Sequence, residues 1–232
     1  MKKSKLLTIV ISFVCFVFSL YSCGGMDETY KEFISDGEIH YPGKADSAQV
    51  HPGGYLRAQL QWLIISDPNI IKCKIVIDGK KELDISVSRS ENVDTIRTIV
   101  DNLDEGIHVF NIYTIDNNGN YSVKEEVIGQ VFGANYIETL YNRRISKVEY
   151  DKNNDEVKLT WAMNPEGAIG VEMAYTDSDG VPQTILVKPE ENTTLLEECP
   201  EGTVLTYKTL FVPDLLSIDI FEAPAINISI PQ

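Results

Sequence analysis

The sequence carries one plan twice, and this internal repeat limits the possible folds more than any other feature. Each copy contains a tryptophan on an alternating strand-like segment, then a turn with proline, then a long apolar run. Trp62 and Trp161 are 99 residues apart, and the later Glu-Gly turns, Glu105-Gly106 and Glu201-Gly202, are 96 residues apart. Matched spacing at two landmarks predicts tandem domains of about 90–100 residues each.

Within each copy the apolar residues recur at every second position. In the first copy they are Leu56, Ala58, Leu60, Trp62 and Ile64, and in the second Val157, Leu159, Trp161 and Met163. A period of two is typical of a half-buried antiparallel strand, because successive side chains point to opposite faces. No stretch after the N-terminal segment keeps a helical period over ten residues, although the connector 135–146 has room for a turn or two.

The strand and turn pattern predicts an all-β protein built from two sandwiches. Further first-copy strands are expected near Cys73–Ile77, Leu83–Val87, Thr95–Val100, Ile107–Ile115 and Tyr121–Ile128. About seven short strands per hundred residues indicate a β-sandwich. An immunoglobulin domain would show a cysteine pair around its tryptophan. Here that pair is missing and the tryptophan comes on an early strand, so the plan resembles tandem fibronectin type III-like (immunoglobulin-like) domains.

The N-terminus predicts export and a lipid anchor. Three lysines precede an apolar run, Leu6–Leu20, and Ser22-Cys23 follows. This order is that of a secretory signal peptide, and the cysteine after Ser22 resembles a bacterial lipoprotein signal with Cys23 as the lipidated residue. The alternative is a transmembrane anchor, but spanning needs about 20 apolar residues. The predicted organisation is 1–22 signal peptide, 23–46 tether and extended arm, 47–132 first sandwich, 133–146 connector and 147–232 second sandwich.

Charge and cysteine content exclude several functions. The formal net charge is −15, which argues against nucleic-acid binding because phosphate contacts require clustered Lys and Arg. Cys73 and Cys199 fall in different predicted domains, so two separate buried thiols are favoured over a disulfide. The Asp/Asn-rich turns 116–120 and 151–155 lack the Gly and Glu of a helical calcium loop. Hairpin turns are therefore predicted there, with calcium at a domain junction as the alternative, and no other metal site or cofactor is expected.

The chain shows no catalytic constellation. It has no nucleophile elbow, no His-Glu-x-x-His pair and no phosphate-binding glycine loop. His108 is in phase with Phe110 and Ile112, which predicts a histidine at the edge of a core. We therefore expect a protein that is not an enzyme and has no catalytic residues.

Several segments are distinctive: Cys23–Glu28, Gly37–Lys44, Arg57 and Leu60–Trp62 with Ser66–Pro68, Asp104–Gly106 and Asp116–Asn120. Together they resemble a family of Bacteroidota surface lipoproteins of unknown function, the domain of unknown function 4998. The resemblance implies paired β-sandwich modules on the outer membrane. Asp27 and Glu28, just after the lipidated cysteine, resemble the signal that sends such lipoproteins to the cell exterior. Longer relatives carry a further C-terminal sugar-binding module, which we do not expect within these 232 residues.

The candidate contact and modification sites are few. Tyr136, Tyr141 and Arg143 in the connector are the first candidates for contact with a ligand or partner, since exposed aromatic rings stack on sugars. Asp46-Ser47-Ala48 and Asp94-Thr95-Ile96 resemble the acceptor motif for O-linked glycans in these bacteria, which would place sugars on Ser47 and Thr95.

Two roles remain open from the sequence. The first is a non-catalytic accessory binding or spacer protein, held on the membrane by its lipid and contacting polysaccharide in glycan capture. The second is a structural or adhesion protein that binds another surface protein, for example by adding a strand at a sheet edge. The final uncharged segment, Ala225–Ile230, would favour the second if its edge is free.

Overall fold

The computed structural model describes residues 40–65, 67–90 and 92–230, and those from Tyr41 onward form one compact unit. The predicted signal peptide, Cys23 and the tether up to residue 39 lie outside the described residues. Within the described part, no helix is long and apolar enough to cross a membrane.

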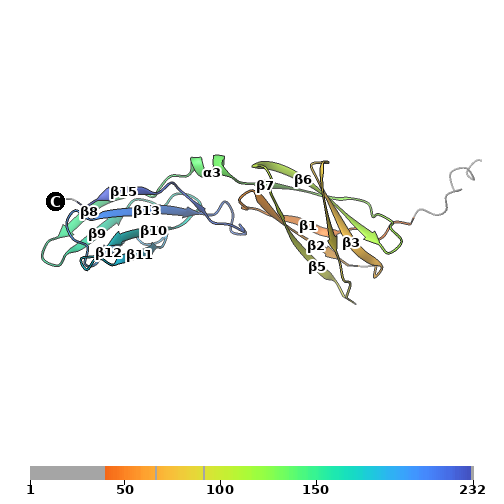
Figure 1. Cartoon of the computed structure of the whole chain (residues 1–232), viewed down its shortest axis with the longest axis horizontal. Helices are drawn as coiled ribbons and strands as arrows, with labels where there is room; N and C mark the ends of the chain where they lie inside the picture. Colours follow the sequence, from red (N-terminus) through yellow and green to blue (C-terminus); the bar gives the residue numbers. More distant parts are fainter. Residues whose placement is uncertain (1–39, 66, 91, 231–232) are drawn as a thin grey trace, which may run out of the picture. The chain divides into compact units, whose positions relative to one another are not determined.

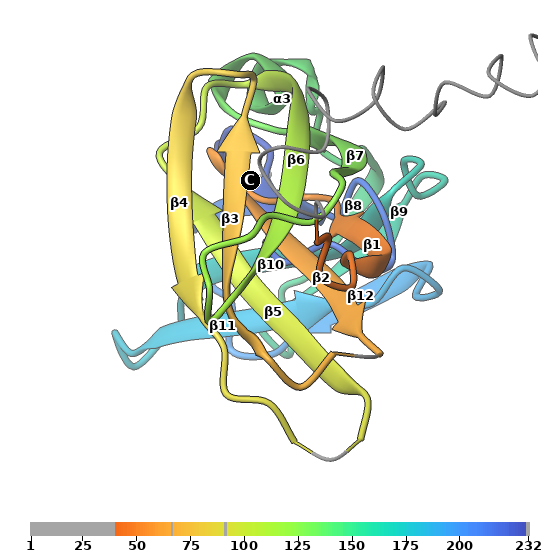
Figure 2. The same cartoon turned by 90° about the vertical axis from the view of Figure 1, so that its right-hand side faces the viewer.

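The first sandwich consists of two antiparallel sheets (Figure 1). Its strands are β1 (Asp46–His51), β2 (Arg57–Ile64), β3 (Ile70–Ile77), β4 (Lys81–Ser86), β5 (Asp94–Asp101), β6 (Gly106–Asp116) and β7 (Glu125–Val131). One sheet has the order β1-β2-β5 and the other β4-β3-β6-β7. Figure 2 shows the sandwich turned, with β4, β3 and β6 forming one layer.

The second sandwich repeats this arrangement. Its strands are β8 (Ile145–Asp151), β9 (Glu156–Trp161), β10 (Ala168–Thr176), β11 (Pro182–Val187), β12 (Thr193–Leu196), β13 (Val204–Phe211), β14 (Phe221–Glu222) and β15 (Ile226–Ser229). The sheets have the orders β12-β9-β8 and β11-β10-β13-β14, and β15 also pairs with β13. A short helix, α3 (Ala134–Thr139), lies in the connector. Each copy thus has a three-stranded antiparallel sheet facing a larger one, of four strands in the first sandwich and five in the second, which confirms the fibronectin type III-like prediction.

Each sandwich has its own apolar core, and the residues at alternate strand positions form it. Trp62 is fully buried among side chains of β2, β3 and β6, and Trp161 occupies the same position on β9. Cys73 and Cys199 are free and buried in these two separate cores, as predicted. Burial raises the pKa of the Cys73 thiol to about 11, so neither a thiolate nor a disulfide forms readily there.

Three predicted strand ends are wrong by a few residues. β9 ends at Trp161, and Met163 lies in the following loop with 91% of its surface exposed. Leu56 precedes β2 and has a positive φ of 51°. β7 begins at Glu125, whereas Tyr121 forms an isolated bridge to Ile115. In each case the alternation of apolar residues continues into a loop, so the pattern alone does not mark where the hydrogen-bonded ladder ends.

The end of the predicted arm belongs to the first sandwich. Ala45 is fully buried in its core. The carbonyl oxygen of Gly43 accepts a hydrogen bond of 2.6 Å from Thr114 Oγ1 on β6, and its N–H donates to Asp67 Oδ2 at 3.3 Å. The chain therefore enters the fold several residues before β1.

His108 on β6 is held at the edge of the first core, as its phase predicted. Its Nδ1 lies 2.6 Å from Asp78 Oδ2 and its Nε2 lies 2.8 Å from the carbonyl oxygen of Asp104. Both oxygens are acceptors, so the doubly protonated imidazolium satisfies both contacts and the neutral ring only one. Burial lowers the pKa of His108, but the bonds to Asp104 and Asp78 outweigh it and the net pKa is raised.

This geometry predicts a pH-dependent contribution to stability. Because the folded pKa of His108 exceeds its ordinary value of 6.5, the contribution is complete below that value and is lost as the pH rises through the folded pKa. Asp78, whose pKa is lowered chiefly by the Val109 N–H, loses its contribution only at pH values below its ordinary 3.8. We expect His108→Gln to reduce the free energy of unfolding by about 1–2 kcal/mol at pH 5.5 and by clearly less at pH 8.5. Urea titrations at both pH values measure this, and an equal loss at both would contradict the assignment.

Candidate functional site

A loop of the second sandwich packs against the segment that leads into β2 of the first. The loop, residues 212–220, joins β13 to β14. Its Ile218 and Asp219 N–H groups donate to the carbonyl oxygens of Pro52 and Gly53, at 3.3 and 2.9 Å. These backbone bonds join segments more than 160 residues apart in the sequence.

Gly53 makes this close approach possible. Its φ is +73°, a left-handed conformation that favours glycine. A Cβ atom at this position would lie 2.1 Å from Ser217 Oγ. A larger residue at position 53 would therefore push the loop away.

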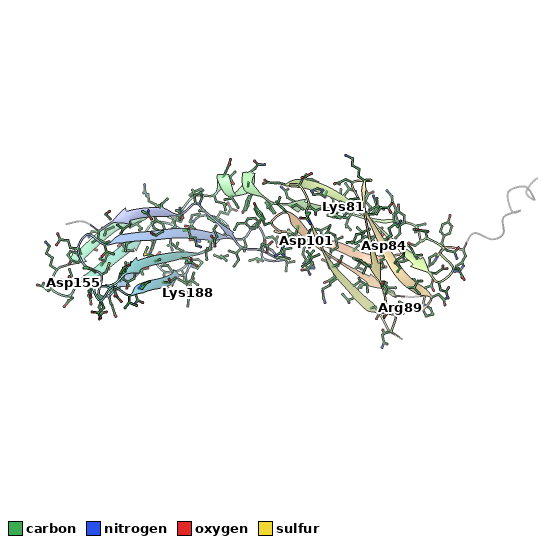
Figure 3. The ribbon with its side chains drawn as sticks, in the orientation of Figure 1. Lys81, Asp84, Arg89, Asp101, Asp155 and Lys188 are labelled. Carbon is green, nitrogen blue, oxygen red and sulfur yellow. The ribbon has the colours of Figure 1, made fainter. Side chains whose placement is uncertain are left out.

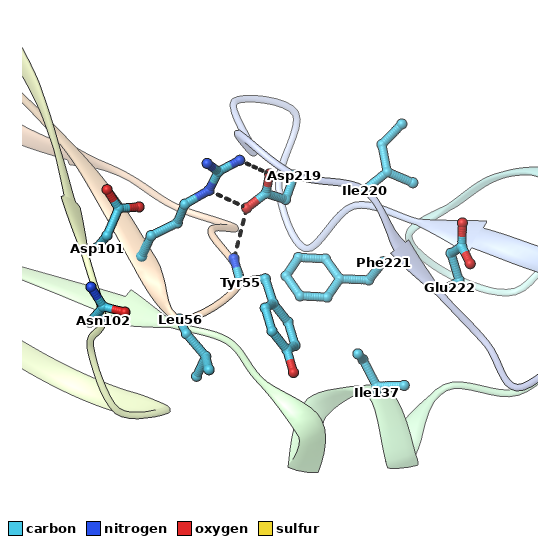
Figure 4. Close-up of a pocket in the computed structure, with 10 residues that line it drawn as sticks. Tyr55, Leu56, Asp101, Asn102, Ile137, Asp219, Ile220, Phe221 and Glu222 are labelled. Atoms are coloured by element: carbon cyan, nitrogen blue, oxygen red, sulfur yellow. Dashed lines mark hydrogen bonds and ion pairs between the residues drawn. The ribbon is translucent and has the colours of Figure 1, made fainter.

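Asp219 is the centre of the junction. Its Oδ2 accepts hydrogen bonds from the Tyr55 N–H at 2.8 Å and from Arg57 Nε at 2.9 Å, and its Oδ1 pairs with Arg57 Nη2 (Figure 4). The hydrogen bond from Arg57 lowers the pKa of Asp219, burial opposes it, and the Tyr55 N–H adds to the lowering. The carboxylate therefore stays ionised over the whole neutral range.

Aromatic rings fill the other side of the junction. The Tyr136 ring on α3 lies 4.6 Å from that of Phe132 and 5.0 Å from that of Phe221, measured between centroids. The carboxylate of Glu105 accepts the N–H groups of Asn135 and Tyr136, both at 2.8 Å, and so fixes the start of α3. The Glu-Gly turn of the first copy thus positions the connector.

A cavity of about 640 Å³ lies beside these contacts, and we call it the junction cavity. It is lined by Tyr55, Leu56, Arg57, Asp101, Asn102, Ile137, Asp219, Ile220, Phe221 and Glu222 (Figure 4). Its volume falls in the range of small-molecule sites, which combine apolar walls with a few polar groups. The polar groups are carboxylates, an amide and a guanidinium already paired with Asp219. This set suits hydrogen bonding to a polar ligand.

A second, smaller cavity of about 330 Å³, the connector cavity, adjoins α3. It is lined by Tyr136, Thr139, Leu140, Tyr141, Glu166, Gly167, Phe211, Val212 and Pro213. As far as the described residues go, no histidine, cysteine or serine lines either cavity. Both cavities combine carboxylates with tyrosine rings and so offer contacts for binding.

The structure separates the three predicted contact residues. Tyr136 and Tyr141 come together in the connector cavity, where Tyr141 is exposed and Tyr136 is half-buried by its ring contacts. Arg143 is 1% exposed. Its Nε donates to the Ala162 carbonyl oxygen at 2.8 Å, and its guanidinium lies 5.7 Å from the Trp161 ring centroid. The expectation that Arg143 contacts a partner is therefore wrong, because the side chain is used inside the second sandwich.

The two predicted glycosylation triplets lie on one sheet. Asp46 on β1 and Thr95 on β5 both pair with Leu63, from its two sides. Ser47 and Thr95 are both exposed, and Ser47 Oγ donates to Asp46 Oδ1 at 2.6 Å. The triplets are accessible at the same end of the β1-β2-β5 sheet, and their modification stays a prediction.

The Asp/Asn-rich turns use their carboxylates internally. Asp116 Oδ1 accepts the N–H groups of Asn118 and Asn120, and Asp151 Oδ1 accepts that of Asn153. These are the contacts of ordinary turns. In the part of the chain that the structure describes, no group of three or more His, Cys, Asp or Glu could hold a metal ion.

Sequence reasoning missed the pair Arg57 and Asp219. Arg57 reads as a polar residue on the outer face of a strand, and Asp219 as one acid among many. A usable signal was Pro52-Gly53-Gly54, because two adjacent glycines between strands indicate a close approach of another backbone.

Comparison with known proteins places the chain in a family. The model of the family domain of unknown function 4998 matches residues 23–221. The chain belongs to this family. A comparison with curated proteins found no match.

Two solved structures similar to this chain contain fibronectin type III domains. A two-domain segment of chicken tenascin is 12% identical, with 82% of this chain and 99% of that chain covered and a TM-score of 0.32. The FN1–FN3 domains of chicken CNTN1 are 11% identical, with 83% and 69% covered and a TM-score of 0.38.

The buried location of Arg143 leads to a prediction about stability, and its neighbour Arg144 provides the control. Arg143→Ala removes buried hydrogen bonds and the contact with Trp161, so we expect the free energy of unfolding to fall by about 2–4 kcal/mol. The exposed neighbour Arg144, replaced by alanine, should change it by less than about 0.5 kcal/mol. Denaturant unfolding of both variants decides this, and equal stabilities would argue against the structural role.

Proposed function

We propose that this member of the family is a lipid-anchored protein of the outer membrane that faces the cell exterior. In this proposal it is a non-catalytic accessory component that binds polysaccharide, or spaces other components, in glycan capture. The observation that carries the binding role is the junction cavity, which Tyr55, 45% exposed, lines together with Asp101, Asn102 and Glu222.

The chemistry of this cavity favours a sugar over an apolar ligand. A pyranose presents C–H groups on its faces and hydroxyls around its rim. The Tyr55 ring offers a surface for the first, and planar carboxylate and amide groups offer hydrogen bonds for the second. Arg57 is neutralised by Asp219, so the cavity has no free cation for an anionic ligand.

The packing of the junction supports the spacer role. Backbone bonds, the Arg57–Asp219 pair and the aromatic contacts of Tyr136 all hold the second sandwich to the first. A protein that holds a partner away from a membrane benefits from such contacts between its modules.

A structural or adhesion role is the second candidate. It is favoured by strands that border their sheets and carry no charge, since such edges pair readily with other chains. β15 is one of them, although its own neighbour β13 already occupies one side.

Polysaccharide binding is tested by electrophoresis of residues 27–232 through gels that contain host or plant polysaccharides. We expect one polysaccharide to retard the protein, and Tyr55→Ala or Tyr141→Ala to remove most of the retardation, since each change removes an aromatic surface on which a sugar face can pack. The control is Tyr121→Ala, because Tyr121 is exposed to the same degree as Tyr55, 46% against 45%, and lines neither cavity. Unchanged mobility in every gel would remove the sugar role.

The anchor is tested separately. Cys23→Ala should abolish incorporation of a labelled fatty acid and release the protein from the membrane fraction, because one residue carries the lipid. Protease treatment of intact cells expressing the unaltered protein then tests the exterior location, and full protection from protease would contradict it.

A further inference from the structure

The two copies of the sandwich differ in the charge of one border strand. β4 borders the β4-β3-β6-β7 sheet (Figure 2), and β11 borders the corresponding sheet of the second sandwich (Figure 1). Cys73 pairs with Ile85 in the first sandwich and Met173 with Ile185 in the second, so each β11 residue corresponds to the β4 residue 100 positions earlier. The two strands can therefore be compared residue by residue.

β4 is protected by charge. Asp84 pairs with Lys72 at 2.9 Å and Glu82 with Lys74 at 2.7 Å, across the outer face of the sheet. Figure 3 labels Lys81 and Asp84 on this strand. Charges on a border strand disfavour pairing with another chain, because the added strand would bury them.

β11 lacks protection by charge, and Pro182 at its first position is the one residue that disfavours pairing. Pro182, Thr184 and Leu186 stand where β4 has Glu82, Asp84 and Ser86, so no residue of β11 is charged. All three are exposed, Leu186 at 60%. Among the described residues no strand pairs with the outer side of β11, which leaves its backbone C=O groups and the N–H groups of its non-proline residues available on that side. Pro182 has no N–H to donate.

Both ends of this uncharged strand are acidic. A small cavity at the Gln183 end is lined by Tyr175, Asp177, Gln183, Glu197 and Glu198. The carboxylate of Asp177 is used by the Val181 N–H and the Gln183 amide, but Glu197 and Glu198 are exposed. At the other end Glu190 is exposed, whereas Glu191 interacts with Arg143. Lys188 is the one basic residue between 177 and 198.

We infer that the free edge of β11 is a strand-addition site for another protein. The partner contributes an extended segment with an uncharged, β-branched centre and with lysine or arginine at its ends. The centre continues the sheet through main-chain hydrogen bonds, and the basic ends meet the acidic groups around Gln183 and Glu190.

Charge argues against a second copy of this chain as the partner. Pairing of two β11 strands would place the acidic ends of one copy beside those of the other, with Lys188 as the one compensating charge in each. The site does not involve the junction cavity, so it stands independently of the glycan role.

The test uses residues 23–232 with Cys23→Ser and a fluorescent peptide, Lys-Thr-Val-Thr-Val-Thr-Lys. Anisotropy should show binding that an otherwise identical peptide with glutamate ends weakens about tenfold, and that added salt also weakens. The variant Pro182→Glu/Thr184→Asp/Leu186→Ser, which gives β11 the residues of β4, should weaken binding of the basic peptide about tenfold as well.

Matched controls separate the edge from general charge and from misfolding. Thr206→Asp adds a carboxylate to the same row of the outer face, on the interior strand β13, and should leave binding within about twofold. Thr184→Val keeps the edge uncharged and should bind like the original protein. If circular dichroism shows that the triple variant is unfolded, the single variant Thr184→Asp is measured in its place.

Three outcomes would overturn the inference. The first is no binding of the basic peptide at millimolar concentration. The second is equal binding by the original protein and the folded edge variant. The third is a dimer, measured by light scattering, that the edge variant converts to a monomer, because a second copy would then occupy β11.

Discussion

The carboxylate of Asp219 is the contact on which the arrangement around the junction depends. It accepts three hydrogen bonds from the first sandwich, one from the Tyr55 backbone and two from the Arg57 guanidinium. A carboxylate taken partly out of water is costly unless its oxygens find such donors. Once they are found, the loop 212–220 is fixed against residues 52–57, and the junction cavity forms beside it.

The surrounding residues support the Arg57–Asp219 ion pair without being part of it. Gly53 lets Ser217 approach, and Glu105 fixes the first turn of α3 from the opposite direction. The ring of Tyr136 then packs on Phe221, two residues beyond Asp219. Polar contact, close backbone approach and aromatic packing thus converge on one short segment, which explains why Tyr136 is less available to a ligand than its position in a connector suggests.

The sequence was sufficient to predict what depends on local periodicity. Alternation around Trp62 and Trp161 predicted the central strands, their buried faces and the separate cores that contain Cys73 and Cys199. These features follow from the pleat of a strand, because successive side chains point to opposite faces and a strand of six to eight residues is long enough to show this alternation in its sequence. Strand ends were predicted less well, because Met163 keeps the alternation after the ladder has ended.

The junction could not be predicted from periodicity. Arg57 and Asp219 are 162 residues apart, and nothing local to either marks the other as its partner. Arg143 shows that periodicity also fails to predict burial in the connector, because an arginine in a connector is expected to be exposed. Its burial follows from the position of Ala162 and Trp161, which only the folded second sandwich brings to it. Contacts between elements distant in sequence decide both cases, and an isolated sequence carries little information about them.

The repeat itself separates residues that build the fold from residues that give each copy its own task. The tryptophans, the apolar rows and the Glu-Gly turns occur in both copies, and they form the same sandwich twice. The glutamate of the Glu-Gly turn makes different contacts in the two copies. Glu105 accepts N–H groups at the start of α3, whereas Glu201 pairs with Lys152 at 3.1 Å. β4 and β11 differ in the same manner, with identical register and opposite edge chemistry. Because β4 and β11 pair in the same register with either set of residues, their difference is not required for that pairing, and it is at such positions that a binding surface is best sought.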